Sequence, residues 1–161
     1  MITSNERLLL NLIKVALGKS TKCALPDAFD WNTLFDLSMK QCVPAIVLDG
    51  LNKCLTVDSN QQLDNEKYKG KKCKLRWLGL TLQMERQYAI HEKVTADLAD
   101  FYDKEGFRMM LLKGYGLSKF WPIPNHRPGG DIDIYLLEKD EDKKCEKVSA
   151  WKRADSILQR K

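Results

Sequence analysis

Residues 108–137, RMMLLKGYGLSKFWPIPNHRPGGDIDIYLL, contain the pattern that decides how this chain folds. Residues 107–112 are a short, almost continuous apolar run bounded by glycines, which predicts a strand rather than a helix. Residues 131–135 alternate polar and apolar side chains, which is the period of a half-buried strand. A glycine turn, a short helix predicted at residues 117–121 and a proline-rich loop lie between them. We therefore expect an α+β fold in which these two strands begin a sheet.

Two aspartates occupy one face of the second predicted strand. The strand period places the carboxylates of Asp131 and Asp133 about 7 Å apart on the same side. Like charges at that spacing repel each other unless a cation lies between them. Carboxylate oxygens suit Mg²⁺, which completes its coordination with water and substrate phosphates. The pair predicts a metal site, and the structural alternative is an exposed strand edge that binds nothing.

Glycines and basic residues beside these strands predict a phosphate site. Gly114 and Gly116 form a turn that precedes the short helix, where backbone N–H groups are available to an anion. Lys113 adds a positive charge, and Arg127 offers a planar guanidinium for phosphate oxygens. For Arg127 the alternative is that its loop is only a connection. A metal site next to a phosphate site predicts a nucleoside triphosphate bound with its metal.

These motifs resemble the signature of the DNA polymerase beta-like nucleotidyltransferase superfamily. That signature is an apolar strand, a glycine turn, a spacer and then Asp-apolar-Asp on the next strand. Residues 112–117, LKGYGL, and 127–133, RPGGDID, are most similar to its bacterial branch of uncharacterised nucleotidyltransferases. The resemblance implies a small mixed sheet flanked by helices. It also implies transfer of a nucleoside monophosphate from a nucleoside triphosphate to an acceptor hydroxyl, with release of pyrophosphate.

The resemblance also implies roles for individual residues. Asp131 and Asp133 would be the catalytic ligands of Mg²⁺ or Mn²⁺. The acceptor would be a small molecule, a protein or RNA. The spacer before Asp131 is longer than is usual in the superfamily. The residues matched to nucleotide binding are Lys113, Gly114, Gly116, Ser118, Arg127 and Gly130.

The superfamily normally supplies a third carboxylate from a later strand. After Leu137 this chain has a short acidic run and then a helical pattern up to Lys161. We therefore expect the chain to be the N-terminal portion of a longer enzyme and to be inactive by itself. An acidic residue in the range 138–141 is the alternative third carboxylate. The alternative function is a non-catalytic nucleotide-binding or regulatory module on the same fold.

The rest of the sequence predicts helices. Thr3 and Glu6 match a capping box for a first helix that ends at Gly18. Asp30 is the expected N-cap of the second helix, and Pro44 is suited to the first turn of the third. The later helices are expected at residues 31–41, 44–54, 75–103 and 142–161. We divide the chain into a helical subdomain at 1–55, a flexible joint at 56–70, and the long helix with the nucleotidyltransferase core at 71–161.

A basic run precedes the long helix. Its members are Lys67, Lys69, Lys71, Lys72, Lys74 and Arg76. We interpret it as the solvated start of a helix, and the alternative is a patch for an acceptor RNA. The net charge of +5 is too small to indicate nucleic-acid binding by itself.

Composition and the remaining polar residues favour a cytoplasmic protein. The five cysteines form no CxxC pair, so we expect free thiols rather than a zinc site or a disulfide framework. The N-terminal apolar residues are too few to span a bilayer and lack a signal-peptide pattern, which excludes a membrane partner. We expect His91 to be a packing residue and assign no role to His126. Trp121 is equally suited to contact a base and to fill the core.

Overall fold

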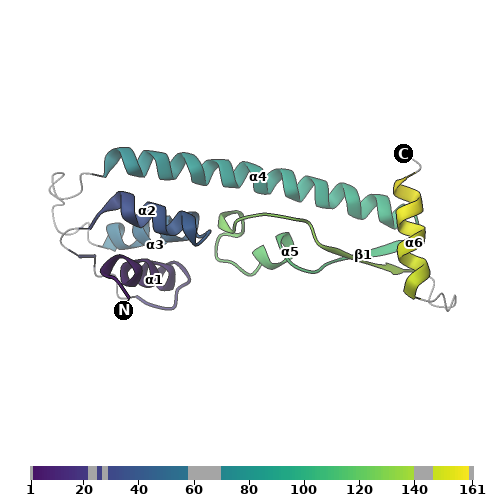
Figure 1. Cartoon of the computed structure of the whole chain (residues 1–161), viewed down its shortest axis with the longest axis horizontal. Coiled ribbons are helices and arrows are strands. Elements are labelled where there is room, and N and C mark those ends of the chain that lie inside the picture. Colours follow the sequence, from purple (N-terminus) through teal and green to yellow (C-terminus); the bar gives the residue numbers. More distant parts are fainter. Residues whose placement is uncertain (1, 22–24, 27–28, 58–69, 140–146, 160–161) are drawn as a thin grey trace. The chain divides into compact units, whose positions relative to one another are not determined.

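The computed structural model describes residues 2–21, 25–26, 29–57, 70–139 and 147–159 (Figure 1). These residues form helices and one two-stranded antiparallel sheet, which confirms the predicted α+β class. The chain divides into two compact units. The helical unit comprises Met1–Gln87 and Phe120–Pro128, and the sheet unit comprises Tyr88–Lys119 and Gly129–Lys161.

The helices of the helical unit begin where the sequence predicts. The Thr3 backbone N–H donates to the Glu6 carboxylate at 2.7 Å and the Glu6 N–H donates to the Thr3 hydroxyl at 3.3 Å, which completes the capping box. The Asp30 carboxylate accepts from the Asn32 N–H at 3.0 Å and caps the second helix. Each cap stabilises its helix by about 1 kcal/mol. The three helices are α1 (Ser4–Ala16), α2 (Trp31–Lys40) and α3 (Pro44–Val57).

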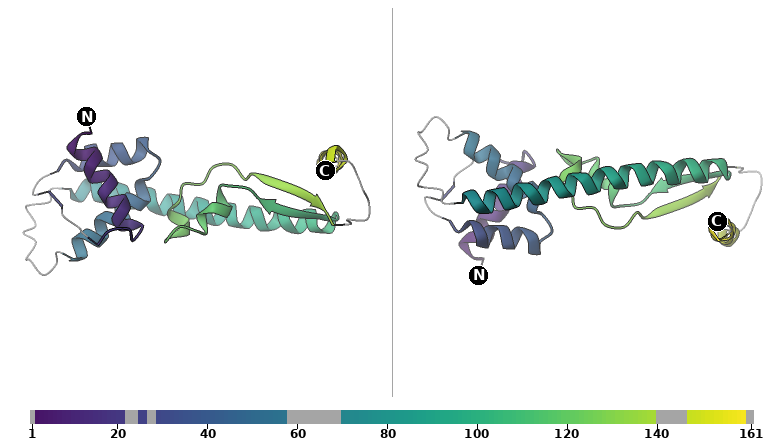
Figure 2. Two further views of the ribbon diagram at one scale, coloured as in Figure 1. Left: turned by 90° about the horizontal axis from the view of Figure 1, so that it is seen from below. Right: turned by 90° about the horizontal axis from the view of Figure 1, so that it is seen from above.

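Apolar faces of these helices enclose one core together with the first part of α4 (Lys71–Lys104) (Figure 2). Leu12, Leu34 and Trp77 are fully buried there. The Trp77 indole N–H donates to the Pro44 carbonyl at 2.7 Å, so this large side chain is buried without an unsatisfied polar group. α1 and α3 lie so close that a Cβ on Gly50 would be 2.1 Å from the Leu12 carbonyl oxygen.

The long helix begins earlier than predicted, at Lys71 rather than at residue 75. Cys73 explains the difference, because its side chain is buried and its thiol donates to the Trp31 carbonyl at 3.4 Å. That contact holds the first turn in place although its lysines oppose the helix dipole. The predicted joint lies mostly at residues 58–69, outside the described residues.

The sheet unit contains two paired strands, β1 (Phe107–Leu111) and β2 (Ile134–Glu138). Their register pairs the first residue of β1 with the last of β2, and the reverse. Phe107 and Leu136 point to a buried inner face, where they meet Tyr102 of α4 and the helix α6 (Lys147–Leu158). Figure 2 shows both strands lying along the second half of α4. The position of the two strands is therefore set by apolar packing against a helix.

The second strand starts later than predicted, at Ile134 instead of Asp131. β1 ends at Leu111, so residues before Ile134 have no strand to pair with. One further backbone bond, from the Leu112 N–H to the Asp133 carbonyl at 3.0 Å, continues the ladder by a single step. The short helix α5 (Tyr115–Ser118) also differs, because it begins directly after Gly114 rather than at residue 117.

The cysteines correct one expectation. Cys42 and Cys73 are free, as predicted, but Cys54 is disulfide-bonded. Spacing in the sequence does not reveal which cysteines meet in space, so this bond had no local signal. Cys23 and Cys145 lie outside the described residues. None of the described helices combines the length and the apolar character that crossing a membrane requires.

Candidate functional site

The glycine turn and the first aspartate are in direct contact. Gly114 has φ 63° and ψ −117°, a conformation that only glycine adopts readily. A Cβ on Gly114 would lie 2.8 Å from the Asp131 carbonyl oxygen, so the two backbones touch. Asp131 is exposed and Asp133 is half-buried, so both carboxylates can be reached from solvent. The structure thus brings together two motifs that are separated in the sequence.

Lys113 connects the same two segments electrostatically. Its ammonium lies 3.1 Å from the Asp133 carboxylate. The Lys113 side chain is 65% exposed and that of Asp133 is 34% exposed, so the pair is open to water. Two residues predicted to bind triphosphate and metal therefore contact each other directly.

Replacing Gly114 by alanine should destabilise the sheet unit. The new methyl group would meet a backbone oxygen, and the positive φ would be strained by about 1–2 kcal/mol as well. We expect a lower urea midpoint in circular dichroism. Gly130→Ala is the matched control, because a Cβ there meets nothing within 4 Å. Equal midpoints for the two variants would contradict the contact.

Ser118 belongs to a network that fixes α5 onto α4. Its buried hydroxyl donates to the Tyr115 carbonyl at 2.5 Å and lies 3.0 Å from the Tyr88 hydroxyl. The Tyr115 hydroxyl donates to Glu92 at 2.5 Å, and the Lys119 ammonium donates to the same carboxylate at 3.1 Å. These bonds use the Ser118 hydroxyl within the protein, and its predicted nucleotide role stays a prediction.

The network changes the proton affinities of its members. Burial, followed by the hydrogen bond to Glu92, raises the pKa of Tyr115. The hydrogen bond from Tyr115, followed by that from Lys119, lowers the pKa of Glu92. Hydrogen bonds with Tyr115 and Glu92 raise the pKa of Lys119 well above its ordinary value. The network therefore keeps one negative and one positive charge next to α5 at neutral pH.

The remaining predicted nucleotide residues are divided between the two units. Gly116 packs against Leu111, whose side chain would be 3.2 Å from an added Cβ. Gly130 is exposed in the sheet unit. Arg127 belongs to the helical unit, where its guanidinium donates to the Pro128 carbonyl at 3.4 Å. His91 is half-buried beside Gly129, which fits the packing role expected of it.

His126 has partners that the sequence did not indicate. Its Nδ1 lies 2.7 Å from the Asp49 carboxylate and its Nε2 lies 2.9 Å from the Glu85 carboxylate. Both ring nitrogens donate to the two carboxylates only when each carries a proton, so this arrangement favours the imidazolium form of His126. The hydrogen bond to Asp49 is the main cause that raises the pKa of His126, against the opposing effect of burial.

Assigning no role to His126 was therefore wrong. This residue anchors its loop, which includes the short helix η2 (Pro124–His126), to α3 and α4 within the helical unit. Its partners are 77 and 41 positions away in the sequence, so no local pattern indicates them. One signal was present: Asp49 interrupts a run of buried residues in α3 and therefore needs a partner.

Trp121 and Arg76, for which the sequence leaves two interpretations, have packing roles. Trp121 is half-buried against the core of the helical unit, which favours the structural interpretation. The Arg76 guanidinium lies 4.4 Å from the centre of the Phe35 ring, so part of the basic run is used in packing. Lys67 and Lys69 lie outside the described residues, and the RNA alternative stays untested.

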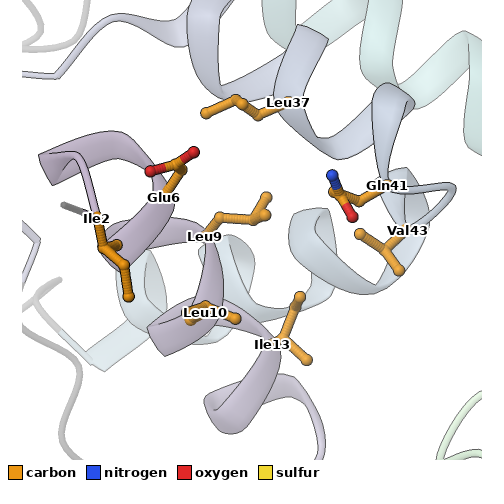
Figure 3. Close-up of a pocket in the computed structure, with 8 residues that line it drawn as sticks. All are labelled: Ile2, Glu6, Leu9, Leu10, Ile13, Leu37, Gln41 and Val43. Carbon is orange, nitrogen blue, oxygen red and sulfur yellow. The ribbon is translucent and has the colours of Figure 1, made fainter.

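A cavity of about 600 Å³ opens in the helical unit between α1 and the end of α2 (Figure 3). Its walls are mostly apolar, and none of the predicted site residues lines it. Glu6 is its one charged residue and is already used in the capping box. The lining residues are Ile2, Glu6, Leu9, Leu10, Ile13, Leu37, Gln41 and Val43.

The two aspartates fit a magnesium ion that arrives with phosphate. The described residues contain no group of three or more His, Cys, Asp or Glu side chains that could hold a metal ion. Asp131 and Asp133 could supply two hard oxygen ligands, and Mg²⁺ commonly uses one or two carboxylates when water and phosphate complete its coordination. We therefore expect weak metal binding to the protein alone and stronger binding with a nucleotide.

Comparison with known proteins decides the family. A family model described as "Uncharacterised nucleotidyltransferase" matches residues 27–148. The chain belongs to this family. The nucleotidyltransferase match includes the glycine turn, both strands and both aspartates, and it confirms the family expected from the sequence. No curated protein and no solved structure matches the chain. Membership supports a general role in nucleotidyl transfer, while a bacterial origin and a longer natural chain stay predictions.

Proposed function

We propose that the chain is a Mg²⁺-dependent nucleotidyltransferase or a portion of one. It would transfer a nucleoside monophosphate from a nucleoside triphosphate to an acceptor hydroxyl and release pyrophosphate. The observation that carries this proposal is the contact of the Gly114 turn with Asp131, next to the Lys113–Asp133 ion pair. The acceptor would be a small molecule, a protein or RNA.

Each residue of the site would contribute by position or charge. Asp131 and Asp133 would hold the metal, which supplies neutralisation of phosphate charge when it is bound. Lys113 would add a second positive charge for the phosphates, and the backbone at Gly114 and Gly116 would line the phosphate site. Ser118, Arg127 and Gly130 are further proposed nucleotide contacts.

A non-catalytic nucleotide-binding module is the second candidate. This candidate follows from the resemblance, which implies a third carboxylate on a later strand than the two that pair here. Such a module would bind a nucleotide with Mg²⁺ but release no pyrophosphate. A pyrophosphate-release assay on protein already shown to bind a nucleotide separates the two candidates.

Isothermal titration with ATP, GTP, CTP and UTP tests the nucleotide site. We expect binding in Mg²⁺ that is lost in EDTA. The Asp131→Asn/Asp133→Asn variant should weaken this binding about tenfold or more, because it removes both proposed ligands but keeps the size of the side chains.

The matched control removes the same charge elsewhere in the sheet unit. Asp97→Asn/Asp100→Asn changes two exposed carboxylates of α4 and should bind as the unchanged protein does. Binding that persists in the Asp131/Asp133 variant, or that is equally strong in EDTA, would contradict the proposed site.

A further inference from the structure

Lys113 occupies a position that a metal ion would also seek. It directly precedes Gly114, and the backbone of its other neighbour, Leu112, is bonded to the Asp133 carbonyl. The Lys113 ammonium reaches the Asp133 carboxylate at 3.1 Å. One carboxylate oxygen of the proposed metal site is thus already used by a protein cation.

The pair can be opened at low cost. An ion pair with 65% and 34% exposed side chains is only weakly stabilising, because water screens both charges. The lysine ammonium is a point charge on a flexible side chain, so its geometry suits a carboxylate and a phosphate equally. A triphosphate carries several negative charges and would compete effectively for this ammonium.

We propose that Lys113 couples metal binding to nucleotide binding. Without a nucleotide its ammonium neutralises Asp133 and repels a divalent cation, so the metal binds weakly. When a nucleoside triphosphate binds, Lys113 moves to the phosphates and leaves Asp133 to the metal. The inference rests on the proposed function and adds an ordered dependence between the two ligands.

Thermodynamic linkage makes the coupling measurable from either ligand. If a triphosphate strengthens metal binding by some factor, the metal must strengthen triphosphate binding by the same factor. Removing the Lys113 charge should reduce that factor, because Asp133 would be available to metal in both states.

The test measures Mn²⁺ affinity by calorimetry or electron paramagnetic resonance, with and without a non-hydrolysable ATP analogue. We expect Lys113→Met to bind Mn²⁺ alone roughly two- to fivefold more tightly than the unchanged protein, the range expected for an exposed ion pair. The analogue should then strengthen Mn²⁺ binding by a smaller factor than it does in the unchanged protein. Lys93→Met is the control, because it removes an exposed lysine of α4 in the same unit.

The outcomes separate this inference from the proposed function. Equal or weaker Mn²⁺ binding by Lys113→Met, or the same gain in Lys93→Met, would overturn the coupling role alone. Mn²⁺ and nucleotide binding unaffected by Asp131→Asn/Asp133→Asn would overturn the proposed site and the coupling together. Tighter Mn²⁺ binding confined to Lys113→Met, with a reduced effect of the analogue, would support the inference.

Discussion

Replacing Gly50 by alanine should destabilise the helical unit by about 3 kcal/mol or more, although alanine is the better helix former. A Cβ at this position would lie 2.1 Å from the carbonyl oxygen and 3.0 Å from the Cα of Leu12. These are backbone atoms of α1, so no side chain can rotate to make room. α1 and α3 would have to separate and expose residues such as Leu51, which is fully buried. Urea unfolding followed by circular dichroism measures the change.

Gly79→Ala is the matched control in a helix. An added Cβ at Gly79 on α4 meets nothing within 4 Å, so only the helix propensity changes. This variant should gain up to about 1 kcal/mol in the free energy of unfolding. If Gly50→Ala behaved as Gly79→Ala does, the close contact of α1 with α3 would be disproved.

Replacing His126 by glutamine should cost about 3 kcal/mol near neutral pH, because it leaves carboxylates in a largely buried position without their cation. The Asp49 side chain is only 15% exposed and that of Glu85 is 33% exposed. Glutamine can replace one of the two hydrogen bonds but carries no charge. Thermal or urea unfolding of both proteins gives the difference.

The pH dependence of this stability difference tests whether the charge of His126 causes it. The pKa of His126 is raised in the folded protein, so the folded protein holds this proton more tightly than the unfolded chain, whose histidine pKa is about 6.5. The stabilisation is fully present below that value and is lost as the pH rises through the folded-state pKa. The difference between the unchanged protein and His126→Gln should therefore shrink in alkaline solution.

A second substitution supplies the control for this histidine. Asp49→Asn combined with His126→Gln removes a charge and its partner together. The double variant should therefore lose less free energy of unfolding than the two single variants lose in sum. Strict additivity, or a difference that is independent of pH, would show that the imidazolium does not stabilise the loop.

Local features of the fold could be predicted from the sequence because they depend on near neighbours. The Thr3–Glu6 capping box and the Asp30 cap join residues within one helical turn. The motifs in residues 112–133 predicted the family correctly, although β2 begins at Ile134 and α5 begins at Tyr115. These signals require no knowledge of the rest of the chain.

Distant contacts could not be predicted in the same way. The His126 bonds depend on two helices meeting the same loop. The start of β2 depends on where β1 ends, which no pattern within residues 131–135 can reveal. The Ser118 hydroxyl is used by Tyr88, a residue 30 positions earlier, and only the packing of α5 on α4 brings them together.

The pairing of β1 with β2 also affects the order in which the site assembles during folding. Pairing these strands closes a loop over residues 112–133, and that closure costs entropy before the pairing can compensate for it. A two-stranded sheet is marginal in water, so it needs the apolar face of α4 to be present first. α4 precedes both strands in the chain and depends on local hydrogen bonds. We therefore expect the helix to form early, and the aspartates to reach the glycine turn among the last events of folding.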